Sequence, residues 1–173
     1  MKLEIARQPI DDLTKDPRVS GCAHLLSLAN GVPRSFFGRR FAALARPVVI
    51  ESDCAGIGIW FGNVMRIARA ILEPVTGQII CCYPEAAVPV LISTSMAAFR
   101  STCAAALDRF PYYAGDDADD APAVARADLE AIIKEIDPDV LKVDSFWVTF
   151  LDDVEMGDFT TEAVERLIAE VSR

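Results

Sequence analysis

The stretch IARAILEPVTGQIICCY, residues 67–83, decides the fold of this chain. Two apolar runs, residues 67–72 and 78–83, flank the loop sequence Glu73-Pro74-Val75-Thr76-Gly77. Proline cannot donate a ladder hydrogen bond, and glycine accepts a positive φ without a steric penalty. The pattern therefore predicts an antiparallel β-hairpin with a short, glycine-containing loop. Because both strands are so apolar, we expect helices to cover at least part of the sheet.

Further strands are predicted around this hairpin. Residues 47–51 and 57–61 are apolar and β-branched, with a break at 52–56 and a turn at Gly62-Asn63. Residues 88–92 continue the sheet, and residues 2–6 are a candidate edge strand. A short core segment ending near residue 44 is also expected, because its large apolar side chains recur at helical spacings: Phe36, Phe37, Phe41 and Leu44.

Helices are predicted mainly in the second half of the chain. An early one covers residues 20–29, with Ser20 as its N-cap, and Ser93-Thr94-Ser95 begins another over residues 96–110. Amphipathic helices follow at 124–136 and 145–154, and a last helix begins at Thr160 or Thr161. Residues 114–123, AGDDADDAPA, have no large apolar group, and we expect a mobile acidic loop there.

Together these elements predict an α+β fold in a single domain spanning residues 1–173. Its centre is a mostly antiparallel, twisted sheet of about four to six strands flanked by helices. A chain of this length is long enough to bury a proper core.

Charge is spread unevenly along the chain, whose formal net charge is −9. Residues 1–75 carry ten basic and seven acidic groups, whereas residues 76–173 carry seven basic and 19 acidic groups. An acidic half repels a phosphate backbone and favours a cationic partner, chiefly by raising the association rate. Surface acid that only keeps the protein in solution is the alternative interpretation. Basic patches interleaved with aromatic residues are not evident, so we do not expect nucleic-acid binding.

The residues that could carry chemistry are sparse. The sequence has one histidine, His24, and lacks the G-x-S-x-G, G-x-G-x-x-G and P-loop patterns. Five cysteines stand at irregular spacings without a C-x-x-C motif, so we expect free thiols and no zinc site: Cys22, Cys54, Cys81, Cys82 and Cys103. Cys81 and Cys82 should point to opposite faces of a strand. We therefore expect a non-enzymatic protein without a metal or cofactor.

The sequence also bears on location. No apolar run reaches the roughly 18 residues that a membrane span needs. The first residues, Met1-Lys2-Leu3-Glu4, do not resemble the apolar core of a signal peptide. We therefore expect a cytoplasmic protein without a membrane partner.

The order of the motifs resembles a known family. The motifs are Gly31-Val32-Pro33, Glu73-Pro74-Val75-Thr76-Gly77-Gln78-Ile79, Ile92-Ser93-Thr94-Ser95-Met96 with Phe99, Ile136-Asp137-Pro138 and Phe146-Trp147. This order resembles the SUKH superfamily of bacterial immunity proteins, most closely its fourth subfamily, over roughly residues 30–157. The chain has Ser93 where the family usually has Asn, and Glu73 where Asp is usual.

The resemblance implies a single-domain α+β binder that neutralises a bacterial toxin domain, often a nuclease or a nucleic-acid deaminase, by occlusion. The acidic half fits a basic partner of that kind. Trp60 and Trp147 are the candidate aromatic anchors, should either be exposed. The candidate acidic contacts are Asp116, Asp117, Asp119, Asp120, Asp152, Asp153, Glu155 and Asp158. Two alternatives stay open: a regulatory protein-interaction module of the same fold, and a small hydrolase that uses His24 or a cysteine beside a carboxylate.

Overall fold

The central hairpin of the sheet forms as its sequence predicts. Strands β6 (Ala68–Leu72) and β7 (Ile79–Cys82) pair antiparallel, with Leu72 opposite Ile79. In the loop, Gly77 has a φ of +76° and donates its amide hydrogen to the Glu73 carbonyl at 3.0 Å. The Glu73 carboxylate accepts hydrogen bonds from the backbone amides of Val75 (3.2 Å) and Thr76 (2.6 Å). The Glu73 carboxylate and the positive φ of Gly77 therefore shape this turn, in the way that Asp, Asn and glycine shape other turns.

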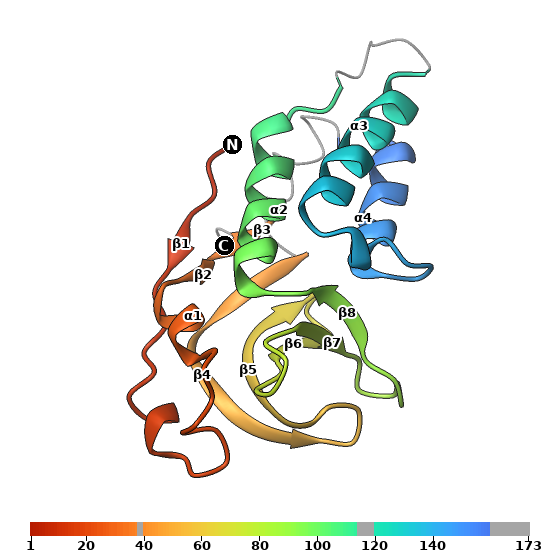
Figure 1. Cartoon of the computed structure of the whole chain (residues 1–173). Coiled ribbons are helices and arrows are strands. Elements are labelled where there is room, and N and C mark those ends of the chain that lie inside the picture. Colours follow the sequence, from red (N-terminus) through yellow and green to blue (C-terminus); the bar gives the residue numbers. More distant parts are fainter. Residues whose placement is uncertain (38–39, 114–119, 160–173) are drawn as a thin grey trace.

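The computed structural model describes residues 1–37, 40–113 and 120–159. Within them a curled antiparallel sheet runs in sequence order, so that each strand pairs with the next (Figure 1). Its other strands are β3 (Ser35–Phe36), β4 (Phe41–Ser52), β5 (Gly56–Val64) and β8 (Val90–Ser93). A separate two-stranded pair joins β1 (Ile5–Ala6) to β2 (Val32–Pro33).

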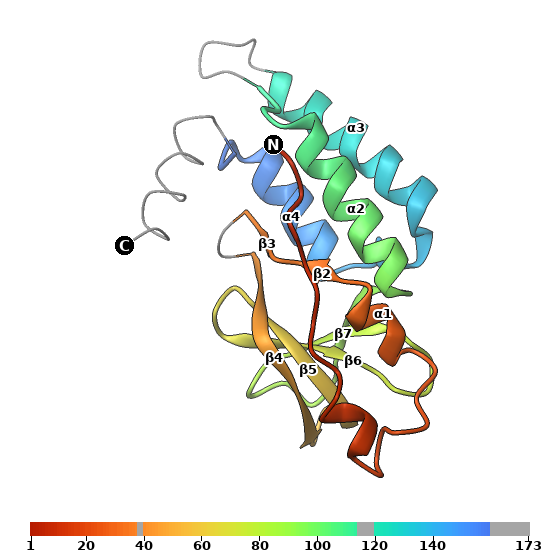
Figure 2. The ribbon, with the colours of Figure 1, turned by 90° about the vertical axis from the view of Figure 1, so that its left-hand side faces the viewer.

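The long helices stand together over one end of the sheet, and the short helix α1 (Leu25–Ala29) lies beside it (Figures 1 and 2). These long helices are α2 (Met96–Arg109), α3 (Ala121–Ile136) and α4 (Phe146–Glu155). Two 3₁₀ turns, η1 (Leu13–Lys15) and η2 (Pro138–Val140), complete the described elements. The predicted α+β arrangement of an antiparallel sheet with flanking helices is confirmed.

Two of the predicted helices begin directly after a serine that caps them. The Ser95 hydroxyl accepts a hydrogen bond from the Ala98 amide at 3.1 Å, and the Ser145 hydroxyl accepts one from the Val148 amide at 3.2 Å. Each bond satisfies an amide that has no partner inside its helix. The predicted helices over 96–110 and 145–154 are therefore confirmed to within one residue.

An aromatic cluster joins the sheet to the helices. Phe36 and Phe37, at the start of the sheet, pack against Trp147 and Phe150 of α4, with ring centroids 5.2–5.7 Å apart for the Phe36–Trp147, Phe36–Phe150 and Phe37–Phe150 pairs. Phe159, beyond the end of α4, contacts Phe37 at 4.8 Å. All five side chains are buried. Such edge and tilted ring contacts add to the free energy of simple area burial.

Several predicted boundaries are wrong. Phe36, Phe37 and Phe41 are buried in the core as expected, but the helical spacing does not form a helix, because Phe36 and Phe41 pair across strands β3 and β4. The turn expected at Gly62-Asn63 lies at residues 65–67 instead, where Met65 and Arg66 both have positive φ. At these positions, pairing between strands determines the structure more than the helical spacing of residues 36–44 or the glycine at position 62 does.

The helix predictions need two further corrections. The predicted helix over 20–29 is helical only from Leu25, because turns occupy the residues before it. Residues 121–123, expected to belong to the acidic loop, form the first turn of α3, where Pro122 is tolerated without losing a hydrogen bond. The rest of that loop, residues 114–119, and the helix expected after residue 160 lie outside the described residues.

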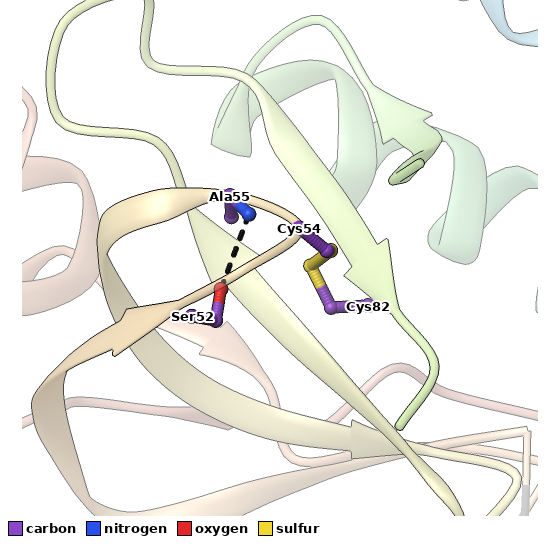
Figure 3. Close-up of a disulfide and its surroundings, with 4 residues drawn as sticks. All are labelled: Ser52, Cys54, Ala55 and Cys82. Carbon is purple, nitrogen blue, oxygen red and sulfur yellow. Dashed lines mark hydrogen bonds between the residues drawn. A yellow bond between two sulfur atoms is a disulfide. The ribbon is translucent and has the colours of Figure 1, made fainter. Parts of the chain in front are cut away.

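The cysteine prediction is also wrong. Cys54, in the β4–β5 loop, and Cys82, at the end of β7, form a disulfide with Cα atoms 6.3 Å apart (Figure 3). The sequence interval of 28 residues gives no sign of this proximity, which depends on the curl of the sheet. Cys81 and Cys82 do point to opposite faces, since Cys81 belongs to the main core and Cys82 to a smaller cluster. Disulfides are typical of oxidising surroundings, whereas the expectation of free thiols assumed reducing ones.

Candidate partner-binding surface

The negative charge of the chain is concentrated in one layer of the fold. Residues 120–159, which contain α3, η2 and α4, carry 11 acidic and three basic side chains, a net charge of −8. We call this part the acidic helical layer. Residues 1–113, which contain the sheet and α2 and are called the sheet body here, carry nine acidic and 12 basic side chains, a net charge of +3. The fold therefore places opposite net charges in adjacent regions.

Four of the candidate acidic contacts lie exposed in this layer. Asp152 and Glu155 are exposed on α4, Asp158 follows the helix, and Asp120 precedes the first turn of α3. The structure brings Asp152 and Glu155 together, because both contact Arg126 of α3. Asp116, Asp117 and Asp119 lie outside the described residues.

Arg126 links the carboxylates of α3 and α4. Its guanidinium lies 2.5 Å from Glu130, 2.9 Å from Glu155 and 3.4 Å from Asp152. Partial burial works against the charged form, but the hydrogen bond and the charge of Glu130 raise the pKa of Arg126 above its ordinary value. Sequence reasoning missed this residue, although its spacing from Glu130 is the i,i+4 spacing of helical ion pairs. One cation thus holds three acidic groups on a shared surface.

Asp153 is the candidate that the structure places differently. It pairs with Arg40, which precedes β4, and the two side chains are only 13% and 16% exposed. Burial lowers the pKa of Arg40 despite the charge of nearby Asp158. The pair fastens α4 to the sheet body, so Asp153 contributes to the attachment of the helices more than to an open surface.

The two tryptophans have different environments. Trp147 is fully buried, and its indole Nε1 donates to the Ile92 carbonyl at 2.8 Å. It is therefore unavailable as an anchor for a partner. Trp60 is half-buried on β5, and the Arg69 guanidinium lies 5.1 Å from its ring centroid. Trp60 thus belongs to the sheet body, and the structure does not group it with the carboxylates of α4.

Three of the motifs that carry the family resemblance, at residues 92–96, 136–138 and 146–147, meet at the start of α2. The buried Asp137 carboxylate accepts hydrogen bonds from the Ser93 hydroxyl (2.6 Å), the Thr94 amide (2.9 Å) and the Thr94 hydroxyl (2.9 Å). Trp147 reaches the same junction through the Ile92 carbonyl. These three motifs therefore hold β8, α2, α3 and α4 together, and their Ser93, Asp137 and Trp147 side chains are buried.

A shallow hollow beside the central hairpin brings together two residues that sequence analysis considered for chemistry. Cys22 and His24 both line this hollow of about 460 Å³, with Arg18, Pro74 and Val75 among its other walls. The Cys22 thiol donates to the Pro74 carbonyl at 3.3 Å. The His24 ring packs over Gly77, where an added Cβ would approach its Nδ1 to 2.5 Å. Both side chains therefore help to seat the hairpin loop.

The chain matches no family model, no curated protein and no solved structure. In residues 1–37, 40–113 and 120–159, no group of three or more His, Cys, Asp or Glu side chains is arranged to hold a metal ion. Among the helices in these residues, none combines the length and the apolar character needed to cross a membrane.

Proposed function

We propose that this protein is an immunity protein that binds a basic toxin domain through the acidic helical layer and neutralises it by occlusion. The proposal rests on the separation of charge, with a net −8 in residues 120–159 beside a net +3 in residues 1–113. The order of motifs that resembles the SUKH superfamily agrees with it. A toxin that acts on nucleic acid must carry cationic groups for its substrate, and such groups complement this surface.

The contacts in the layer suggest how binding would proceed. Asp152, Glu155 and Asp158 would first attract the basic partner over a distance of about one Debye length, about 8–10 Å at physiological salt. Arg126 already holds two of these carboxylates in place, so the surface loses little side-chain freedom when a partner docks. The ion pairs would then cover the nucleic-acid-binding groups of the toxin. Cytoplasmic action and a nuclease or deaminase partner are parts of this proposal.

The test uses the full chain and, as the toxin, the purified product of the adjacent open reading frame. The variant Asp152→Asn/Glu155→Gln/Asp158→Asn removes three charges from the layer, and Asp11→Asn/Asp12→Asn/Glu85→Gln removes three exposed charges from the sheet body. We expect the first variant to weaken binding at least ten-fold and to lose protection of toxin-expressing cells. The matched control should bind like the native chain. Equal effects of both variants, or affinity unchanged between 50 and 500 mM salt, would contradict the proposal.

A small hydrolase is the second candidate, favoured by the hollow that Cys22 and His24 share. A thiol nucleophile requires a base within hydrogen-bond reach, whereas the Cys22 thiol donates to the Pro74 carbonyl. Activity toward an activated ester that disappears in both Cys22→Ser and His24→Gln would establish this alternative. Equal hydrolysis by the native chain and the variants would remove it. The regulatory interaction module would be favoured by binding to a host protein when the toxin domain does not bind.

A further inference from the structure

The Cys54–Cys82 disulfide borders a cavity of about 300 Å³ between the β4–β5 loop and the end of β7. Both cysteines line this cavity, together with Glu51, Asp53 and Arg69. Cys54 is half-buried, whereas Cys82 is only 5% exposed. A small molecule can therefore approach the disulfide from the Cys54 side without unfolding of the sheet.

The disulfide joins strand β7 to the β4–β5 loop, at whose base Ser52 pairs with Gly56. Within the loop, the Ala55 amide donates to the Ser52 hydroxyl at 3.2 Å and to the Ser52 carbonyl at 3.3 Å (Figure 3). These bonds are local and shape the turn itself. Figure 3 shows the sulfur–sulfur bond reaching from this turn to the neighbouring strand β7. The covalent bond and the packing of the loop side chains therefore attach the two segments to each other.

A small apolar cluster lies next to the disulfide, separate from the main core. Its buried members are Ile71, Ile80 and Cys82, and Cys54 and Ala55 from the loop pack against them. Since Ile71 is fully buried and Ile80 is 8% exposed, the loop contributes to keeping their side chains from water. Moving the loop away would expose part of this apolar surface.

The other cysteines are poorly placed to exchange with this disulfide. Cys81 points to the opposite face of β7, and burial raises its pKa to about 12. Cys103 is fully buried on α2, where burial also raises its pKa well above the ordinary value. Cys22 lies in the hollow beside the central hairpin. Because the thiolate is the attacking species in exchange, internal rearrangement is disfavoured and an external thiol is required.

Arg69 stands directly opposite Cys82 in the antiparallel register of β6 and β7. It also lines the same cavity. Directly opposed side chains in such a pair lie about 5 Å apart at their Cβ atoms. The Arg69 guanidinium, which lies 5.1 Å from the Trp60 ring centroid, is therefore on the same face of the sheet as Cys82. A thiolate left on Cys82 would have this cation nearby, which makes that sulfur the better leaving group.

We propose that the Cys54–Cys82 disulfide is a redox latch, opened by a low-molecular-weight thiol that enters the cavity. The thiolate attacks the Cys54 sulfur, the Cys54–Cys82 bond breaks, and the electron pair leaves with the Cys82 thiolate, which then takes up a proton. A second thiol attacks the mixed disulfide and releases the Cys54 thiol. In sum, two small thiols become one small disulfide, and the protein gains two thiols. The freed loop then exposes the cluster around Ile71 and Ile80.

The experiment compares the oxidised and the reduced chain in native buffer, with glutathione as the thiol. Alkylation followed by mass spectrometry should show two new reactive cysteines, Cys54 and Cys82, while Cys81 and Cys103 stay unmodified. Hydrogen exchange of the amides in residues 52–56 and 79–82 should rise at least ten-fold on reduction, and that of α2 and α4 should stay unchanged. Reduction that requires denaturant, or exchange that stays the same after reduction, would overturn the proposal.

Variants distinguish opening of the loop from a general loss of stability. Cys54→Ser/Cys82→Ser should show the fast exchange without any thiol, and Cys22→Ser is the matched control that should respond to glutathione like the native chain. Should the double variant fail to fold, the reduced native chain provides the same measurement. Arg69→Gln should slow reduction several-fold relative to Arg66→Gln, an exposed control in the β5–β6 turn. Equal rates would remove Arg69 from the mechanism. This inference is independent of the proposed toxin partner.

Discussion

The sheet body and the acidic helical layer are stabilised in different ways. The sheet body holds itself together through a continuous antiparallel ladder from β3 to β8 and one disulfide. The acidic helical layer carries a net charge of −8 and depends on its attachments to the rest of the fold. Those attachments include the aromatic cluster, the Asp137 hydrogen bonds and the Arg40–Asp153 pair.

The comparison separates residues that build the fold from residues that are free to bind. Asp137 and Trp147 are buried at the junction between the two regions, although they belong to the motifs that carry the family resemblance. Asp152, Glu155 and Asp158 are exposed and belong to none of those motifs. The motifs of the family resemblance therefore stabilise the fold. The charged surface residues that would select a partner lie outside these motifs.

The largest expected effect comes from removing the aromatic attachment. Trp147→Ala should lower the free energy of unfolding by about 3–5 kcal/mol, because it empties a large buried site and leaves the Ile92 carbonyl without its indole donor. Trp60→Ala in the sheet body is the matched control and should cost about 1–2 kcal/mol, since that side chain is only half-buried. Urea unfolding followed by circular dichroism measures both. Equal losses would mean that the two tryptophans contribute alike and that the comparison fails.

The next effect concerns the polar clamp between the regions. Asp137→Ala should cost about 2–4 kcal/mol, because the Ser93 hydroxyl and the Thr94 amide lose a charged acceptor in a buried place. Asp139→Ala, two residues further on and exposed, should change stability by no more than about 0.5 kcal/mol. Thermal unfolding of both variants provides the measurement. A small loss for Asp137→Ala would show that the clamp is replaceable by water.

Much of this scaffold could be predicted because its signals are local. Gly77 and Glu73 shape the hairpin loop within six residues, and Ser95 and Ser145 cap their helices within three. Such short-range hydrogen bonds depend on residues that stand close together in the sequence. The strands and helices near these signals were therefore placed correctly.

The contacts that could not be predicted from the sequence join residues that are far apart in it. Arg40 and Asp153 pair across the fold, and Cys54 meets Cys82 because the sheet curls. The Trp147 ring packs against Phe36, which is far from it in the sequence. The sequence composition is enough to find the acidic region. Only the three-dimensional structure shows that Asp153 is paired with Arg40, whereas Asp152 is exposed.

A smaller effect tests how charge is balanced within the acidic helical layer. Arg126→Met keeps the apolar stem but leaves Glu130, Asp152 and Glu155 without their shared cation. We expect a loss of about 1 kcal/mol at low salt, which should shrink in 0.5 M NaCl because salt screens the remaining repulsion. Lys134→Met, exposed on the same helix, is the control and should show neither change. A loss that does not depend on salt would indicate packing of the stem in place of charge balance.

The smallest effect lies in the central hairpin of the sheet body. Although burial works to raise the pKa of Glu73, the hydrogen bonds donated by Thr76 and Val75 and the charge of His24 lower it below its ordinary value. A carboxylate with a lowered folded-state pKa stabilises the protein above its ordinary pKa, and this contribution is lost as the pH falls through the folded-state value. Glu73→Gln should therefore cost at most about 0.5 kcal/mol at neutral pH, since the bonds are exposed to solvent. The difference should vanish on acidification in urea unfolding followed by circular dichroism, with Glu85→Gln, exposed in the β7–β8 loop, as the control for removal of a surface carboxylate. If the difference grew in acid, the carboxylate would not be what shapes the turn, and the local account of the hairpin would be wrong.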